Sequence, residues 1–390
     1  MCEGLEGSRK VRILSLLYHS PTSGIAAGGF RRTYEIFKRA PDNVEILAVD
    51  NSPSFLCGIE KSNVHVMDYR IPRLLRRFES KFFIPERLAE WLVALFCMTF
   101  ASLRLRLSGR AFDLIYVPSS EIFPSLLAGM AAKYIFNRKL ILCNMNIDIY
   151  SNPVKCLMAR LHNSAVKVIA LSKDLEIKLR KYGTTVPFVL NGAGIDHQFI
   201  SATLSDRKLE KRYDAVFLGR LTVHKGTLDL VEIWSMVVST FPSAKLLVVG
   251  SADPVNLALL QASIDEHKLQ ENIELEGMVD EKRKFLLLKS SKLCLFPSHV
   301  EEWGIVPQEA LACGLPVVLY DLPVYKENIK QCEAVFAFPL GDVLSMAEQT
   351  IELLSNKEYL EYEDIGPAYV SKFSWDATAE VEFAALTGDV

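Results

Sequence analysis

The chain has 390 residues, 50% of them hydrophobic, and a net charge of only −3 at pH 7. This length allows two α/β domains that each bury a core, and the weak charge argues against a general nucleic-acid-binding protein. The eight cysteines are scattered without a C-x-x-C pair, which favours reduced thiols over disulfides or a structural zinc site. The polar N-terminus predicts no secretory signal, so we expect the protein in the cytoplasm.

Short apolar runs alternate with helical runs along the chain, a pattern typical of parallel sheets covered by helices. Two sets of strands predict two doubly wound domains, and glycines interrupt the pattern at a junction near Asn191–His197. The predicted strands are Val11–Leu17, Val44–Val49, Val64–Met67, Leu114–Val117, Lys139–Leu142 and Val166–Ala170 in the first set, and Asp214–Leu218, Lys245–Val249, Asn272–Leu275, Leu293–Phe296, Val317–Tyr320 and Ala334–Phe338 in the second.

The segment after the first predicted strand contains two adjacent glycines, Gly28 and Gly29, which would let the backbone approach a ligand closely. A plain loop with a glycine helix start is an equal alternative. For Arg31 and Arg32, which follow, solvated helix charges are favoured over phosphate contacts. His19 lies directly after the strand and is the best of the histidines as a candidate ligand contact.

A basic and aromatic segment, Tyr69–Phe83, precedes a long apolar run, Trp91–Leu103. Basic residues interleaved with Leu and Phe suit an anionic membrane surface, and a solvated basic loop is an equal alternative. The apolar run is shorter than the ~20 residues that a spanning helix needs, so a core helix is favoured there. The cations of the basic segment are Arg70, Arg73, Arg76, Arg77 and Lys81, against one acid, Glu79.

Two carboxylates in the second half, Glu301 and Glu309, lie eight residues apart across a predicted strand-to-helix turn. The buried strand before them places both near the carboxyl edge of a sheet, with Glu309 at the start of a helix. Ligands bind at that edge in open α/β sheets, and helix N-termini suit anionic groups. An exposed loop acid at Glu301 and a simple helix-dipole interaction at Glu309 are the alternatives.

Four segments resemble the family-4 retaining glycosyltransferases of the GT-B fold, in that family's order and at its spacing. The resemblance covers 189–380 and is loose before that. It implies two doubly wound Rossmann-like domains that face a central cleft: an acceptor-side domain at 1–195 and a nucleotide-sugar-binding domain at 196–374, with a last helix, about 375–390, packed back on the first. The four segments are VLNGAGID (189–196), FLGRLTVHKG (217–226), EEWGIVPQEALACGLPVV (301–318) and KFSWDATAE (372–380).

The resemblance also implies roles for individual residues. Arg220 and Lys225 would face the donor diphosphate, Glu309 would bind the donor ribose, and Glu301 would lie against the transferred sugar. Many family members have a histidine after the fifth strand, where this chain offers Asn146 or Asp148 as sugar or acceptor contacts. The implied catalytic residues are Glu301, Arg220 and Lys225, and the implied donor contacts are Glu309, Gly304, Ile305, Val306, Gly219, Gly28 and Gly29.

The implied function is retaining transfer of a hexose from a nucleotide diphosphate sugar to a hydroxyl of a glycan or lipid-linked acceptor, without a cofactor. The sequence contains no Asp-x-Asp pair, which favours fixed cations over a metal ion as the diphosphate stabiliser. Attachment to the cytoplasmic face of a membrane would use Tyr69–Phe83. The alternatives are a non-catalytic sugar-nucleotide or glycan-binding protein of the same fold and a sugar-nucleotide epimerase.

Overall fold

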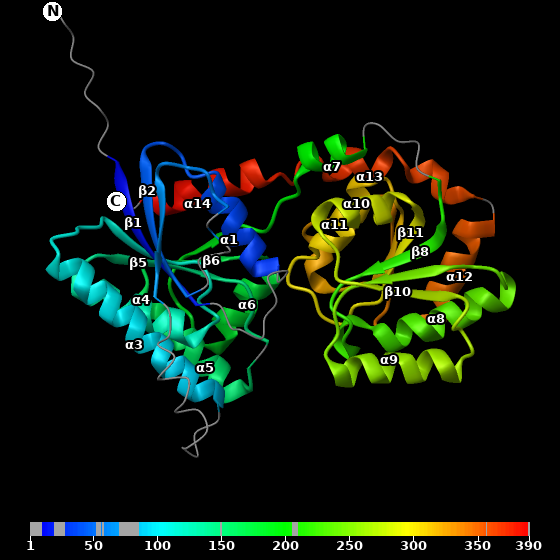
Figure 1. Cartoon of the computed structure of the whole chain (residues 1–390), viewed down its shortest axis with the longest axis horizontal. Coiled ribbons are helices and arrows are strands. Elements are labelled where there is room, and N and C mark those ends of the chain that lie inside the picture. The colour runs from blue at the N-terminus through cyan, green and yellow to red at the C-terminus, as the bar shows by residue number, and fades with distance from the viewer. Residues whose placement is uncertain are drawn as a thin grey trace, which may run out of the picture. The chain divides into compact units, whose positions relative to one another are not determined.

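The computed structural model divides the chain into two compact units (Figure 1). The N-terminal domain comprises Met1–Gly194 and Trp375–Val390, and the C-terminal domain comprises Ile195–Ser374. The chain passes from one domain to the other twice, near Ile195 and near Ser374. These two segments are adjacent, and the Ile195 amide donates a hydrogen bond to the Phe373 carbonyl at 2.9 Å. The structure describes residues 10–18, 28–51, 56, 58–69, 86–148, 150–204, 210–355 and 357–388.

The N-terminal domain is built on a parallel sheet of seven strands in the order β3-β2-β1-β4-β5-β6-β7. The chain runs outward from β1 to β3 and restarts at β4 on the other side, which is the doubly wound arrangement. Its central strands are buried along nearly their whole length because helices cover both faces. The strands are β1 (Val11–Leu17), β2 (Val44–Asp50), β3 (Val64–Asp68), β4 (Leu114–Val117), β5 (Lys139–Asn144), β6 (Lys167–Ala170) and β7 (Phe188–Leu190).

The helices of this domain connect successive strands, except for the last helix, α14, which returns from the C-terminal domain and packs against α1. They are α1 (Gly28–Lys38), α3 (Glu86–Leu107), α4 (Phe123–Phe136), α5 (Asn152–Leu161), the 3-10 turn η2 (His162–Ser164), α6 (Lys173–Tyr182) and α14 (Trp375–Thr387).

The C-terminal domain repeats the doubly wound plan with six parallel strands in the order β10-β9-β8-β11-β12-β13. Its strands are β8 (Tyr213–Leu218), β9 (Leu246–Val249), β10 (Ile273–Gly277), β11 (Ser291–Phe296), β12 (Val317–Tyr320) and β13 (Val335–Phe338). Its helices and 3-10 turns are α7 (His197–Leu204), η3 (Val223–Lys225), α8 (Thr227–Thr240), α9 (Pro254–Glu266), α10 (Glu281–Lys289), α11 (Ile305–Ala312), η4 (Pro323–Lys326), α12 (Val343–Ser355), η5 (Glu358–Tyr362) and α13 (Ile365–Val370).

The two predicted sets of strands and the doubly wound class are confirmed. Each of the predicted strands is present, with ends that differ by at most two residues. One strand was missed: β7 has three residues, pairs only with β6 and is partly exposed. A strand so short contains no alternation by which the sequence could reveal it.

The expectation of a core helix over Trp91–Leu103 is wrong in one respect. The helix exists as α3, but Phe96 and Phe100 are 65% and 57% exposed. Its buried side consists of small or flexible residues, among them Ala94 and Met98. Apolar content predicted the helix, but it does not reveal which side of a helix faces the core.

Arg32 is neither a solvated charge nor a phosphate contact, so both readings of the sequence are wrong at this position. Its side chain is fully buried and binds both carboxylate oxygens of Glu382 on α14, at 2.6 and 3.1 Å. It also donates to the carbonyls of Asn191 and Gly192 at 2.9 and 2.8 Å, just before the domain crossing. Burial works to raise the pKa of Glu382, but the Arg32 guanidinium outweighs it and holds that pKa below its ordinary value.

Candidate functional site

Predicted donor residues of the C-terminal domain lie at the topological switch point of its sheet. The strand order changes direction between β8 and β11, which are adjacent and parallel. Lys225 lies in the connection that follows β8, and Glu301 lies in the connection that follows β11. Both connections leave the carboxyl edge of the sheet, where open α/β folds bind their ligands.

Glycines allow the loops at this edge to touch. A Cβ atom on Gly226, before α8, would lie 1.7 Å from the carbonyl oxygen of Pro297, which follows β11. A Cβ atom on Gly250, after β9, would lie 1.7 Å from the carbonyl oxygen of Gly219, which follows β8. Both glycines have positive φ. Only glycine fits such contacts, so the loop after β8 contacts both the loop after β11 and the loop after β9.

Lys225 and Glu301 form an ion pair across the switch point. The Lys225 Nζ atom lies 2.5 Å from Glu301 Oε1 and donates to the carbonyl of Val300 at 3.2 Å. Both side chains are mostly shielded from solvent, with 19% and 11% of their surface exposed. The sequence placed these residues on different parts of a donor, and the structure brings them into direct contact.

Arg220 lies five residues before Lys225 in the same connection, and its side chain is exposed. Among the residues that the structure describes, no carboxylate pairs with its guanidinium. Gly219, beside it, donates its amide to Val249 at 3.0 Å and so fixes the start of the loop to the neighbouring strand. The loop therefore presents a cation at the edge of the sheet.

The segment that leads to Glu301 is held by a network that the sequence did not predict. His299 Nε2 lies 2.9 Å from Asp229 Oδ2 in the first turn of α8, and the Tyr320 hydroxyl donates to the same oxygen at 2.6 Å. The Ser298 hydroxyl donates to the Val300 carbonyl at 3.1 Å. These contacts join the segment just before Glu301 to α8 and to the end of β12.

Glu309 does not lie at a helix start, as the sequence predicted, but in the second turn of α11. Its side chain is almost fully buried, and its Oε1 accepts a hydrogen bond from Lys284 of α10 at 2.7 Å. A buried ion pair, rather than the helix dipole, therefore balances its charge. A carboxylate has about four acceptor sites, so this contact is compatible with additional hydrogen bonds from a ligand.

Gly304 is the N-cap residue directly before α11 and has φ +80°, and a Cβ atom there would lie 2.6 Å from the Tyr325 ring. The backbone amides that follow it, at Ile305 and Val306, belong to the first turn, where amides lack partners within the helix. Tyr325 is a residue that the sequence analysis missed. Its hydroxyl is buried without a hydrogen-bond partner in the described part of the chain, and burial, together with the Glu301 charge, raises its pKa.

In the N-terminal domain, Gly29 and Met145 meet at the carboxyl edge of the sheet. A Cβ atom on Gly29, which follows Gly28 in the first turn of α1, would lie 3.0 Å from the Met145 side chain. The Met145 amide donates to Glu121 Oε2 at 3.1 Å. Burial raises the pKa of Glu121 to about 7. No sequence pattern indicated Glu121, because a lone acid between a strand and a helix is common.

The two polar residues proposed in place of the family's histidine have other contacts. Asn146 Oδ1 accepts the Asp148 amide at 2.6 Å, which closes a turn after β5. Asp148 forms ion pairs with Lys155 and Lys178, at 2.6 and 2.7 Å. Its charge is therefore balanced by the protein itself, and Asn146 is the better placed of the two for a ligand. His19 and most of the segment Tyr69–Phe83 lie outside the described residues.

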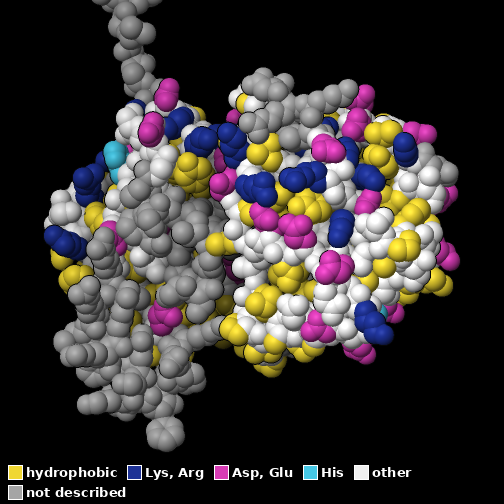
Figure 2. Space-filling view, turned by 45° about the vertical axis from the view of Figure 1, so that its right-hand side comes forward, with side chains coloured by type: hydrophobic (Ala, Val, Ile, Leu, Met, Phe, Trp, Pro, Cys, Tyr) yellow, Lys and Arg dark blue, Asp and Glu magenta, His cyan; other side chains and the backbone are white. Residues whose placement is uncertain are grey.

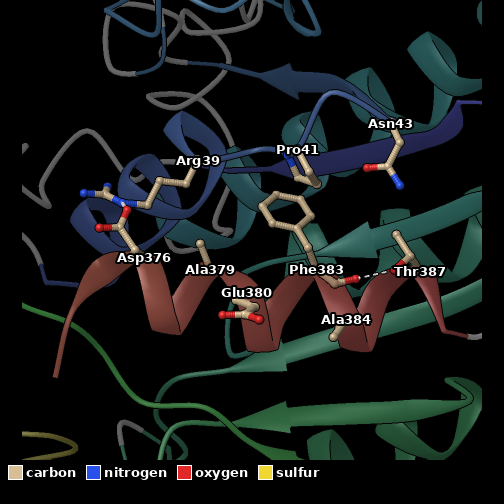
Figure 3. A pocket seen from close by; sticks show the side chains of 9 residues that line it. All are labelled: Arg39, Pro41, Asn43, Asp376, Ala379, Glu380, Phe383, Ala384 and Thr387. Carbon is tan, nitrogen blue, oxygen red and sulfur yellow. Dashed lines mark hydrogen bonds and ion pairs between the residues drawn. The ribbon is translucent and has the colours of Figure 1, made fainter. Parts of the chain in front are cut away.

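A hollow on the N-terminal domain, between α14 and the end of α1, involves none of the predicted site residues (Figure 3). Of its three charged lining residues, Arg39 and Asp376 pair with each other at 2.7 Å, and the third is Glu380. We interpret it as a packing groove beside α14. Its lining residues are Arg39, Pro41, Asn43, Asp376, Ala379, Glu380, Phe383, Ala384 and Thr387.

The surface of the C-terminal domain seen in Figure 2 shows Lys and Arg side chains interspersed with Asp and Glu. Such a mixed surface lacks the continuous basic face typical of nucleic-acid-binding proteins. Within the described ranges, no group of three or more His, Cys, Asp or Glu side chains is arranged to hold a metal ion.

The chain is similar to known glycosyltransferases. A family model described as glycosyl transferases group 1 matches residues 204–366. The phosphatidyl-myo-inositol mannosyltransferase of Mycobacterium leprae is 30% identical over 224 residues, which are 56% of this chain and 58% of that protein. The GDP-mannose:cellobiosyl-diphosphopolyprenol alpha-mannosyltransferase of Xanthomonas campestris is 23% identical over 162 residues, 41% of this chain and 43% of that protein. The chain thus matches about half the length of these relatives.

Solved structures share the fold. The crystal structure of Anabaena HepE in complex with UDP and glucose is similar with a TM-score of 0.76 and 19% identity, over 97% of this chain and 100% of that chain. At this identity the likeness shows the fold alone. The GT-B fold class expected from the sequence is confirmed.

Proposed function

We propose that the protein is a retaining glycosyltransferase, because a family model described as glycosyl transferases group 1 matches residues 204–366, most of the C-terminal domain. It transfers a hexose from a nucleotide diphosphate sugar to an acceptor hydroxyl. The observation that carries the proposal is the Lys225–Glu301 pair at the switch point, with Arg220 in the same loop. A cation and a carboxylate held together there suit a ligand that has a diphosphate next to a polar sugar.

The charged residues at the switch point suggest how the proposed transfer proceeds. As the bond between the anomeric carbon and the diphosphate breaks, negative charge grows on the diphosphate, and Lys225 and Arg220 stabilise it. Glu301 contacts the transferred hexose, and Glu309 accepts hydrogen bonds from the ribose hydroxyls. The acceptor attacks from the side on which the diphosphate departs, and a diphosphate oxygen takes the acceptor proton. This route retains the configuration and needs no nucleophile from the enzyme.

The acceptor is a glycan or a lipid-linked glycan at the cytoplasmic face of a membrane. Two relatives support a lipid-linked acceptor, since one is a phosphatidyl-myo-inositol mannosyltransferase and the other acts on a cellobiosyl-diphosphopolyprenol. The basic composition of Tyr69–Phe83 suits the same surface. If the basic segment is what docks, changing Arg73, Arg76 and Arg77 together to Glu releases the protein from anionic vesicles without altering donor affinity.

A thermal-shift panel of UDP-, GDP- and ADP-sugars tests donor binding. A ligand that binds only the folded protein stabilises it by about 2.7 kcal/mol at a hundredfold excess over Kd. We expect one base to raise the melting temperature of the wild type and to have much less effect on Lys225→Met. If no nucleotide sugar shifts either protein, the proposed donor site is wrong.

A further inference from the structure

Helix α3 presents a row of large apolar side chains to solvent. Consecutive members are three or four residues apart, so they share one side of the helix. The row runs from Leu88 to Leu107, twenty residues, and the nineteen steps of 1.5 Å between its ends give a length of about 28 Å. Its members are Leu88 (46% exposed), Leu92 (52%), Phe96 (65%), Phe100 (57%), Leu103 (43%) and Leu107 (79%).

The opposite side of α3 packs against the domain and is less apolar in character. Its buried residues are Ala94, Met98, Ser102 and Leu105, and α3 lies along α4 at the margin of the domain (Figure 1). A surface helix of a globular protein ordinarily turns its large apolar side chains inward. Helix α3 instead exposes its large apolar side chains to solvent, which is typical of an interaction surface.

Two observations indicate a lipid bilayer as the partner. First, Leu88–Leu107 is long and apolar enough to cross a membrane, yet only 28% of it is buried. Because its other side is packed along α4, the helix is placed to lie in a bilayer surface rather than to span it. Second, the C-terminal end of the row is basic, with exposed Arg104, Arg106 and Arg110 and no acidic residue between Trp91 and Arg110.

We propose that the apolar row of α3 docks the protein on an anionic lipid bilayer. The Leu and Phe side chains enter the boundary between head groups and acyl chains, and the arginines at the end of the helix meet the anionic head groups. The proposal rests on α3 alone and does not depend on the proposed sugar transfer.

Co-sedimentation with vesicles of phosphatidylglycerol and phosphatidylcholine tests the proposal, with Phe96→Ser/Phe100→Ser as the variant. Serine removes the apolar surface without adding charge, and both side chains point to solvent, so the fold should tolerate it. We expect vesicle affinity to fall at least about tenfold. The matched control is Val255→Ser/Leu259→Ser on α9, two side chains of similar exposure in the other domain. It should bind vesicles as the wild type does.

A second measurement tests whether the side chain at position 96 enters the acyl-chain region of the bilayer. The Phe96→Trp variant should gain a tryptophan signal that is quenched by lipids brominated in the acyl chains. The proposal is overturned if the wild type ignores anionic vesicles at low salt, or if the serine variant binds them unchanged. It is also overturned if the new tryptophan is not quenched, or if the serine variant changes only a dimer into a monomer, which would assign the row to a second copy of the chain. Nucleoside diphosphate binding by the serine variant, measured in parallel, reports on the donor site separately.

Discussion

At the residue scale, the proposed donor site contains ionisable side chains that form ion pairs with each other. Lys225 pairs with Glu301, and Glu309 pairs with Lys284. The family resemblance predicted both members of the first pair and Glu309 of the second as ligand contacts. The structure adds that Lys225 and Glu301 bind each other, and that Lys284 holds Glu309 in position.

The first prediction concerns the Lys225 charge. Lys225→Met should lower turnover by about 10²- to 10³-fold, because a fixed charge at the developing diphosphate is lost. The matched control is Lys292→Met. Lys292 pairs with Asp214 at 2.6 Å across the same two strands, β11 and β8, but at their amino ends. Initial rates at saturating donor check this, and equal losses in both variants would contradict the assignment.

The second prediction concerns the ribose contact. Glu309→Gln should weaken binding of the nucleoside diphosphate about tenfold, because an ionised acceptor is lost. Lys284→Met should weaken it too, since the carboxylate then loses the cation that fixes it. Glu281→Gln, which changes the other and exposed partner of Lys284, should bind normally. Titration calorimetry without the sugar measures all three, and unchanged affinity in Glu309→Gln would disprove the ribose role.

At the element scale, the last helix is attached to the first domain by a buried charge pair. Glu382→Gln should lower the free energy of unfolding by about 3–5 kcal/mol, because Arg32 then stays buried without its partner. Glu380→Gln changes an exposed acid on the same helix and should cost less than about 0.5 kcal/mol. Urea unfolding followed by circular dichroism compares them. Equal midpoints for Glu382→Gln and the wild type would refute the anchoring role.

Another prediction at this scale concerns pH. Burial raises the pKa of Glu121 from 4.5 to about 7, so the folded protein holds this proton more tightly than the unfolded chain. Its contribution to stability is therefore full below pH 4.5 and is lost as pH rises through 7. The loss amounts to at most about 3 kcal/mol. In urea unfolding, the free energy of unfolding should fall less between pH 5 and pH 8 for Glu121→Gln than for the wild type. Parallel curves for the two proteins would rule this out.

At the scale of the whole molecule, strand patterns predicted nearly every strand, because buried parallel strands are continuous apolar runs. Patterns could not predict contacts between distant residues. Arg32 and Glu382 are 350 residues apart, and nothing local indicates that either is buried. The same limit applies to α3, whose apolar residues look alike in sequence whether they face the core or the solvent.

The proposed reaction also makes a prediction for the whole protein. Because protein cations are assigned to the diphosphate, activity should survive EDTA. Initial rates with and without the chelator test this, with an added Mg²⁺ or Mn²⁺ arm. Loss of activity that either ion restores would contradict a metal-independent reaction.

The most direct test of the central claim is product analysis by nuclear magnetic resonance after incubation with the nucleotide sugar that binds and a lipid-linked acceptor. The account predicts release of the nucleoside diphosphate and a new glycosidic bond with the anomeric configuration of the donor. The wild type and Lys292→Met should form this product at similar rates, and Lys225→Met at a rate about 10²- to 10³-fold lower. Binding without transfer would assign the chain to the sugar-nucleotide-binding proteins. An isomerised donor would make it an epimerase, and an inverted product would exclude the retaining mechanism.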